Sequence, residues 1–192
     1  MSLLPASAAL LIIDVQRAID HPSWGVRNHP VADQRIADLL DWWRQRRMPI
    51  YHVRHDSVEP RSTYRPGQPG HEFKPEAAPR PDEPVIPKST SSAFVNTGLE
   101  ARLRGAEQAV LVVAGVITNN SVEATVRHTG CLGFNVYLAE DACFTFGRPD
   151  WNGVPRSADE IHAMSLANLH GEYCTVTTPA EIRASLASAP PQ

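Results

Sequence analysis

Apolar and polar positions alternate along the chain in two patterns. Six short apolar runs, several of them rich in valine or isoleucine, are typical of strands buried on both faces; they cover residues 8–13, 50–53, 85–87, 109–114, 134–138 and 173–176. Between them, apolar residues recur at helical spacing, which predicts helices over 31–47, 99–104, 121–130, 157–169 and from 179 onward. The alternation predicts an α/β fold. We expect a single three-layer α/β/α domain over residues 1–192, with a six-stranded parallel sheet and a Rossmann-like arrangement.

Two segments between these elements are expected to be loops. Residues 54–84 are rich in proline and glycine, and Tyr64 and Phe73 stand alone among polar neighbours, which suggests an ordered wall or lid over a site. Residues 148–155 form the second predicted loop. The strand over 134–138 is predicted to end at Glu140-Asp141-Ala142.

The composition of the chain argues against nucleic acid, a membrane and a zinc ion as partners. The chain has 192 residues and a formal net charge of −3, with no basic stripe, so we expect no nucleic-acid partner. The first apolar run is too short to span a bilayer and no basic segment precedes it, so we expect no membrane association and a cytoplasmic protein. The cysteines, at 131, 143 and 174, have no paired spacing, which argues against a disulfide framework and a zinc site.

Three polar residues each come directly after, or shortly after, a buried strand: Asp14, Lys88 and Ser121. In a parallel sheet with helices on both faces, the carboxyl ends of the strands share one edge, and ligands bind there. Taken singly, each residue has a structural explanation, as a loop-capping carboxylate, a solvated lysine or a helix-capping serine. Together, an acidic group, a basic group and a hydroxyl at one edge favour a hydrolytic site.

Ser121 follows a turn-forming segment, Thr118-Asn119-Asn120, and should lie in the first turn of a helix. Backbone N–H groups are unpaired at that end of a helix and its dipole favours negative charge. An attacking oxygen or a developing oxyanion could be stabilised at this place.

Four segments of the chain form distinct motifs: the first strand with its acidic residue Asp14, the Pro-Lys and Ser-Ala-Phe pattern around Lys88, the segment 114–125, and Asp141-Ala142-Cys143 after the fifth strand. Together they resemble motifs of one known family, the isochorismatase-like cysteine hydrolases. The first is similar to that family's first-strand motif, the second to its lysine motif, and the third to its nucleophile loop. The resemblance covers nearly the whole chain.

The resemblance implies a set of properties. It implies an acid–lysine–nucleophile triad at Asp14, Lys88 and Ser121, and a non-proline cis peptide between Val116 and Ile117. The N–H groups of Ile117 and Ser121 would then face an oxyanion. It also implies a homodimer or higher homo-oligomer. We expect a small-molecule substrate and no cofactor.

One residue departs from the family pattern, because Ser121 stands where the family has cysteine. A hydroxyl needs a stronger base than a thiol does, and we expect Asp14 to be weakened further as a base by pairing with Lys88. Three hypotheses therefore stay open. The protein hydrolyses a C–N bond of an amide or carbamoyl compound, if the serine replaces a native cysteine; or it hydrolyses a vinyl ether such as isochorismate without a covalent intermediate; or it is a non-catalytic relative that binds a small molecule.

Further residues are candidates for the substrate pocket. Gln16 belongs to the first motif, and Arg54 could bind a carboxylate through its guanidinium fork; the other candidates are Trp24, His55 and Phe94. A metal site of the nicotinamidase kind needs an Asp-x-His pattern and a further histidine. His55-Asp56 followed by His71 does not match that spacing, so we predict no metal.

Overall fold

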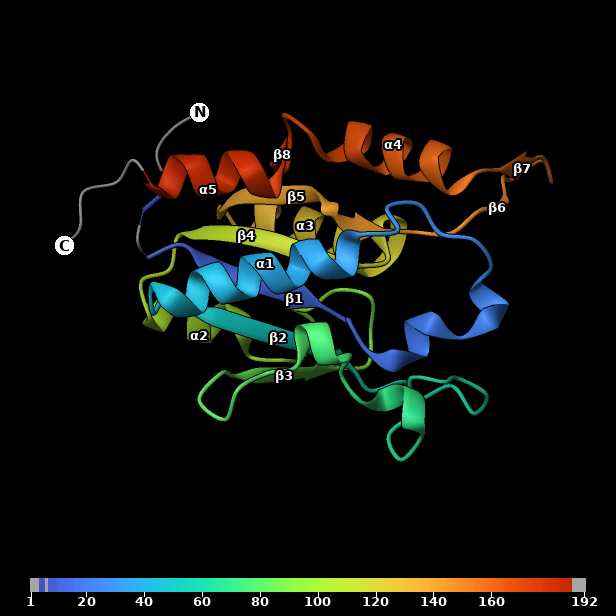
Figure 1. The fold of residues 1–192 in the computed structure, drawn as a ribbon, viewed down its shortest axis with the longest axis horizontal. Coiled ribbons are helices and arrows are strands. Elements are labelled where there is room, and N and C mark those ends of the chain that lie inside the picture. Colours follow the sequence, from blue (N-terminus) through green and yellow to red (C-terminus); the bar gives the residue numbers. More distant parts are fainter. Residues whose placement is uncertain (1–3, 6, 188–192) are drawn as a thin grey trace.

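Six parallel strands form the central sheet of the computed structural model, which describes residues 4, 5 and 7–187 (Figure 1). The spatial order is β3-β2-β1-β4-β5-β8. The strands are β1 (Ala9–Ile13), β2 (Ile50–His55), β3 (Val85–Lys88), β4 (Val110–Val116), β5 (Asn135–Phe144) and β8 (Thr175–Thr177). This confirms the predicted α/β class and the six-stranded parallel sheet.

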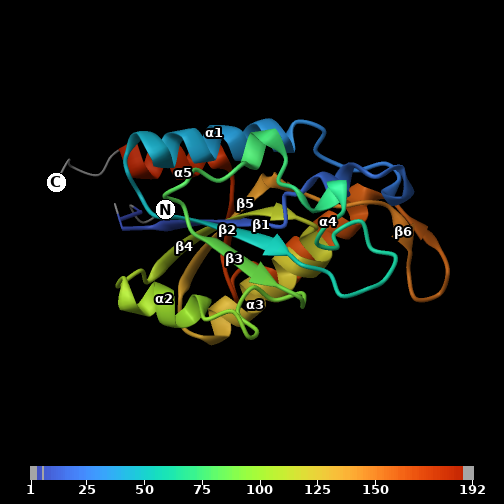
Figure 2. The same cartoon turned by 90° about the horizontal axis from the view of Figure 1, so that it is seen from below.

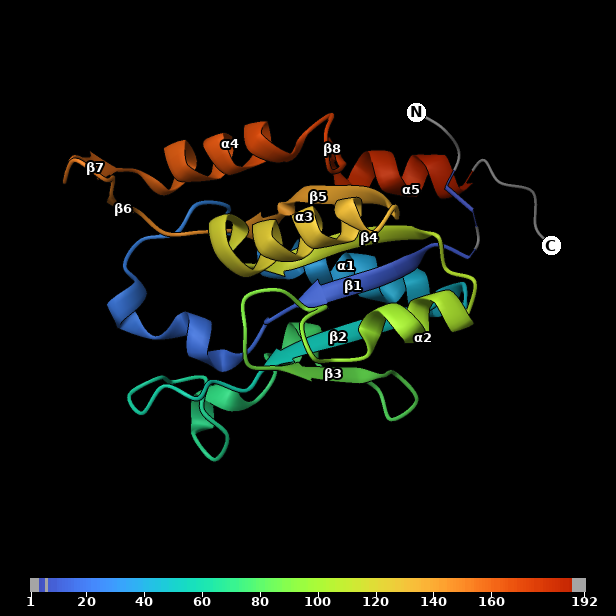
Figure 3. The same cartoon turned by 180° about the vertical axis from the view of Figure 1, so that it is seen from behind.

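Helices cover both faces of the sheet, as Figures 2 and 3 show. Helices α1 and α5 lie on one face, and α2 and α3 lie on the other, while α4 runs beside the β5–β8 edge. Their bounds are α1 (Ala32–Gln45), α2 (Leu99–Gly105), α3 (Glu123–Cys131), α4 (Ala158–Leu169) and α5 (Pro179–Ala187). No helix of the described residues combines the length and apolarity that a membrane span requires.

The alternation of side chains along β1 explains why the sheet needs two covering layers. Leu10 and Ile12 pack into the cluster that includes α1 and α5, whereas Leu11 and Ile13 pack into the cluster that includes α2 and α3. Successive residues of a strand point to opposite faces. A continuous apolar run therefore fills both interiors at once.

The direction of winding reverses between β1 and β4, which are neighbours in the sheet although α1, β2, β3 and α2 lie between them in sequence. Gly115 makes their close approach possible: its φ is +128°, and a Cβ there would collide with the backbone of Ile13. The crevice at such a reversal is where open α/β sheets bind ligands. Asp14 and the turn that carries Ser121 leave the sheet at this point.

Two predicted boundaries were wrong. Strand β5 does not end at Glu140-Asp141-Ala142 but continues to Phe144, because a bulge absorbs those residues: Val113 pairs with Leu138, and Gly115 then pairs with Cys143. The predicted loop at 148–155 is a small antiparallel hairpin of β6 (Arg148–Pro149) and β7 (Pro155–Arg156). Its strands are too short to leave a periodic pattern in the sequence.

Candidate active site

Asp14 follows β1 directly and points its carboxyl group into a buried site. Its φ is +53°, and its N–H donates to the carbonyl of Val53 at 3.0 Å, so the neighbouring strand holds this unusual conformation. Oδ2 accepts a hydrogen bond from Lys88 Nζ at 2.7 Å. Oδ1 is buried and has no hydrogen-bond partner among the described residues. A buried polar oxygen without a partner is rare and marks a place where a ligand or water can bind.

Lys88 is the last residue of β3, and its side chain contacts both Asp14 and Ser121. Its buried Nζ donates to Asp14 Oδ2, to the carbonyl of Thr90 at 2.9 Å and to Ser121 Oγ at 3.3 Å. Nζ also lies 3.4 Å from His55 Nδ1, so the three donors of the ammonium face four acceptors. Lys88 is thereby held in one position between the carboxylate and the hydroxyl.

Ser121 lies in a π-helical turn, Thr118–Val122, that joins β4 to α3. Its side chain is nearly buried, and its Oγ accepts from Lys88, so the hydroxyl proton is free to point elsewhere. The expected convergence of Asp14, Lys88 and Ser121 is therefore present, although they come from three strand ends far apart in the sequence.

The expectation that pairing with Lys88 makes Asp14 a weaker base is wrong. Burial raises the pKa of the Asp14 carboxyl above its ordinary value, although the Lys88 ammonium and the nearby Ser121 side chain act in the opposite direction. Pairing with Lys88 thus does not leave Asp14 a weaker base than an exposed carboxylate, because loss of hydration outweighs the attraction. A raised pKa makes a carboxylate a better proton acceptor.

Two neighbours of the triad are electrically neutral at pH 7. Burial and the Lys88 ammonium lower the pKa of His55 to about 4, and burial raises the pKa of Tyr64 well above its ordinary value. The Tyr64 hydroxyl donates to the carbonyl of Asp14 at 3.4 Å. The ammonium of Lys88 is therefore the positive charge that balances Asp14 in this part of the site.

A cavity of about 290 Å³ opens onto the triad. Asp14 and Ser121 line it, and so do two of the predicted pocket residues, Trp24 and His55. Tyr64 lines it as well, from the segment predicted to form a wall. The sequence analysis missed several other lining residues, whose small polar side chains are common in any loop: Ser62, Ser89, Thr90, Ser91 and Asn120.

Gln16 was expected in the pocket but is not among the described residues that line it. Its fully buried amide bonds to the backbone of two other segments: Nε2 donates to the carbonyls of His55 and His71, and Oε1 accepts from the N–H of His55 at 2.7 Å. Gln16 therefore joins the segment after β1 to the end of β2.

Arg54 and Phe94 also lie outside the described lining of this cavity. The guanidinium of Arg54 is bound through two nitrogens to Asp56, whose Oδ1 also contacts His71 Nε2 at 2.8 Å. The guanidinium of Arg54 is thus the cation that pairs with the Asp56 carboxylate. Phe94 instead packs in the apolar layer under α2, with its ring 6.1 Å from that of Phe134.

The peptide bond between Val116 and Ile117 is cis, and both residues line the cavity. The N–H of Ile117 donates to no acceptor in the described part of the chain. A free N–H on a residue that lines the same cavity as Ser121 is a donor for an oxygen atom of a bound molecule.

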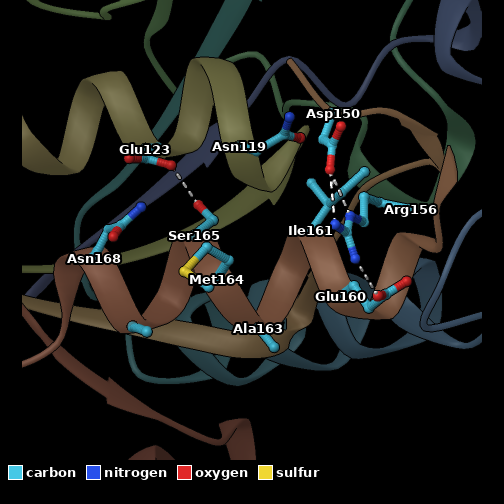
Figure 4. A pocket seen from close by; sticks show the side chains of 11 residues that line it. Asn119, Glu123, Asp150, Arg156, Glu160, Ile161, Ala163, Met164, Ser165 and Asn168 are labelled. Carbon is cyan, nitrogen blue, oxygen red and sulfur yellow. Dashed lines mark hydrogen bonds and ion pairs between the residues drawn. The ribbon is translucent and has the colours of Figure 1, made fainter. Parts of the chain in front are cut away.

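A larger hollow, of about 750 Å³, lies along α4 (Figure 4). Its charged groups are bound to one another: Arg156 contacts Asp150 at 2.8 Å and Glu160 at 3.4 Å, and Ser165 Oγ donates to Glu123 at 2.6 Å. None of the described residues that line this hollow has a buried side-chain atom without a hydrogen-bond partner. Its size therefore does not make it a better candidate for chemistry than the smaller cavity at Asp14.

A family model, related sequences and a solved structure all match this chain to the isochorismatase family. Residues 8–181 match the family model of the isochorismatase domain. The isochorismatase family protein YrdC of Bacillus subtilis is 38% identical over 170 residues, which are 88% of this chain and 91% of that one. Nicotinamidase 3 of Arabidopsis thaliana is 26% identical over 193 residues, covering 93% and 88%. A crystal structure of an isochorismatase-family protein from Chromobacterium violaceum matches with a TM-score of 0.96 and 62% identity, over 98% of each chain.

Proposed function

Because the chain belongs to the isochorismatase domain family, we propose that it is a hydrolase that cleaves a C–N bond of a small, uncharged amide or carbamoyl compound. The observation that carries the proposal is the Asp14 carboxyl group. One of its oxygens is held by Lys88, and the other is buried, unpartnered and next to the cavity that Ser121 lines.

Asp14 is the general acid–base in this proposal. Its free Oδ1 takes the proton of the Ser121 hydroxyl while Oγ attacks the carbonyl carbon, and the electron pair of the C=O bond moves onto oxygen, near the N–H of Ile117. Asp14 then passes the proton to the departing nitrogen as the C–N bond breaks. A water molecule attacks the resulting ester and gives one proton to Asp14. The C–O bond to Ser121 then breaks, and Asp14 returns that proton to Oγ, which releases the acid and restores both the Ser121 hydroxyl and the Asp14 carboxylate.

The raised pKa of Asp14 is what makes serine workable in the place of a thiol. A hydroxyl loses its proton reluctantly, so the base beside it must bind a proton better than an ordinary carboxylate does. Burial supplies that increase. Lys88 positions both oxygens, because its Nζ contacts Asp14 Oδ2 and Ser121 Oγ.

Size and charge of the cavity support an uncharged, small substrate. A volume of about 290 Å³ is at the lower end for small-molecule pockets. Its described lining contains no arginine, and the Lys88 ammonium beside it is already paired with Asp14. The relationship to nicotinamidase 3, a protein named for action on an amide, points the same way.

Vinyl-ether hydrolysis is the second candidate, and the raised pKa of Asp14 favours it too, since a carboxyl group that keeps its proton can donate it to a C=C bond. Ser121 would then be only a hydrogen-bonding group. Isochorismate itself is a dicarboxylate, however, and placing it beside Asp14 without a free cation would be costly. The charge of the lining therefore favours the C–N substrate.

The test is a turnover screen of the wild type against small amides and carbamoyl compounds, with isochorismate alongside. We expect at least one neutral amide or carbamoyl compound to be hydrolysed, Ser121→Cys to be faster, and Asp14→Asn to lose a factor of about 10³, the middle of the range for general acid–base groups. Asp20→Asn is the matched control, because Asp20 is also 2.7 Å from a lysine, Lys74, but does not line this cavity. If only isochorismate is turned over, vinyl-ether hydrolysis replaces C–N hydrolysis as the function. If neither the wild type nor Ser121→Cys turns over any compound, the protein is a binding protein and not a hydrolase.

A further inference from the structure

A second group of chemistry-bearing side chains lies apart from the triad. His29 precedes α1, Glu140 lies in the bulge of β5, and His162 is on α4. One nitrogen of each histidine and one oxygen of Glu140 lie within 4.8 Å of one another. Glu140 Oε2 is 3.8 Å from His29 Nε2 and 3.7 Å from His162 Nε2. None of the three residues is part of the described lining of the cavity at Asp14.

The other ring nitrogens fix how the histidines are oriented. His29 Nδ1 lies 2.9 Å from the carbonyl oxygen of Cys143, which can only accept, so in the neutral ring Nδ1 carries the proton and Nε2 carries the lone pair. His162 Nδ1 lies 2.9 Å from the Thr118 hydroxyl, which can accept in the same way. Both Nε2 atoms are then free to act as ligands.

His162 provides an independent sign that something binds here. Its side chain is only 6% exposed, and its Nε2 is buried without a hydrogen-bond partner in the described part of the chain. Buried polar atoms are nearly always satisfied by protein, water or an ion. This nitrogen faces Glu140 at a distance too long for a direct hydrogen bond.

We propose that His29, Glu140 and His162 form a binding site for a divalent transition-metal ion, for which zinc is the natural probe. Two imidazoles and a carboxylate are a donor set that zinc uses with water as a fourth ligand. Zinc–ligand bonds of about 2.0–2.1 Å place tetrahedral ligand atoms roughly 3.3 Å apart. The contacts of 3.7 and 3.8 Å need to close by about half an ångström, and the two histidine nitrogens, which lie within 4.8 Å of each other, by up to about 1.5 Å.

The surroundings match those of known metal sites. Histidines that bind metals donate their second nitrogen to a carbonyl, carboxylate or hydroxyl group that holds the ring in place, and the Cys143 carbonyl and the Thr118 hydroxyl occupy these positions. The side chains of His29 and Glu140 are 26% and 28% exposed, which leaves a path for the ion.

An ion in this place would brace the active site without touching the substrate. It would tie α4 and the β5 bulge to the segment before α1. Through His162 and Thr118 it would also hold the turn Thr118–Val122, which carries Ser121. The role is therefore one of positioning, and the site does not depend on which substrate the protein hydrolyses.

The experiment uses the full chain, freed of metals by a chelator and dialysed. Titration with Zn²⁺ followed by elemental analysis measures stoichiometry and affinity, and titration with Co²⁺ gives a visible spectrum that reports its ligands. We expect one ion per chain, and a melting temperature raised by roughly 5–10 °C at a hundredfold excess over Kd. Glu140→Gln and His29→Gln should weaken binding by at least about 100-fold, the upper end of the loss seen for outer-shell partners alone.

Two control variants locate the site. His21→Gln removes an exposed histidine, and His71→Gln removes the histidine beside Asp56, so both should bind as the wild type does. Binding that survives Glu140→Gln, or that is lost in His71→Gln, would overturn the assignment. So would an absence of stoichiometric binding by a wild type that is folded by circular dichroism, because the cluster would then be a histidine–carboxylate ion pair only.

Discussion

Replacing Lys88 by methionine isolates the energetic role of the buried pair. The substitution keeps the length of the side chain but removes the ammonium, and it leaves Asp14 Oδ2 without its 2.7 Å partner. At an effective dielectric of 20, charges at that separation attract by about 6 kcal/mol, and the desolvation of both ions offsets part of this. Breaking one side of a buried pair typically costs about 3–5 kcal/mol. For a chain of this size, the melting temperature should fall by roughly 6–20 °C.

The loss should depend on pH in a definite direction. Without Lys88, the pKa of Asp14 rises further above its unfolded value, so the folded state binds a proton more tightly than the unfolded state does. A group whose pKa is raised on folding contributes stability below its unfolded pKa, and that contribution is lost as pH rises through the folded pKa. The deficit of Lys88→Met relative to the wild type should therefore be smaller at pH 4 than at pH 7.

Urea denaturation at the two pH values measures this effect, provided that the slope of the unfolding free energy against urea is unchanged. Arg17→Met is the control, because Arg17 forms an exposed pair with Glu72 and should lose less than about 1 kcal/mol. A Lys88→Met deficit below about 1 kcal/mol at pH 7, or an equal deficit at both pH values, would refute the reasoning.

Three other substitutions test single features of the structure. Gly115→Ala should destabilise by about 3 kcal/mol or more, since both its φ of +128° and the Ile13 backbone oppose a Cβ; a change below 1 kcal/mol in urea denaturation would contradict the close β1–β4 contact. Phe94→Ala should cost about 3–5 kcal/mol while KM changes less than about twofold, because Phe94 packs in the core and not in the pocket. Arg54→Gln should also leave KM within about twofold, since the guanidinium is bound to Asp56; a tenfold rise in KM would instead place Arg54 at the substrate.

The meeting of Asp14, Lys88 and Ser121 could be predicted from the sequence because each follows a buried strand, and parallel strands bring their carboxyl ends to one edge. That rule fixes where a residue leaves the sheet but not where its side chain points. Gln16 follows β1 and Arg54 lies near the end of β2 at the same edge of the sheet, yet their polar groups are bound by the His55 backbone and by Asp56. Such contacts join segments that no local pattern connects.

The remaining errors have a similar origin. The bulge that carries β5 past Glu140 depends on pairing with β4, so a sequence pattern that ends at Leu138 cannot reveal it. The raised pKa of Asp14 depends on how completely the site is buried, whereas the sequence shows only that a lysine is available. The proposed metal ligands belong to three segments distant in sequence and share no spacing rule.

The pH dependence of kcat/KM tests the central claim most directly, on whichever neutral amide or carbamoyl compound the wild type hydrolyses. If Asp14 is the base, activity must fall at low pH as the carboxylate takes up a proton. The midpoint of that fall should lie above about 3.9, the value for an unperturbed aspartate, because burial raises the pKa of Asp14. A profile that stays flat down to pH 4, or one that Asp14→Asn leaves unchanged, would contradict the account.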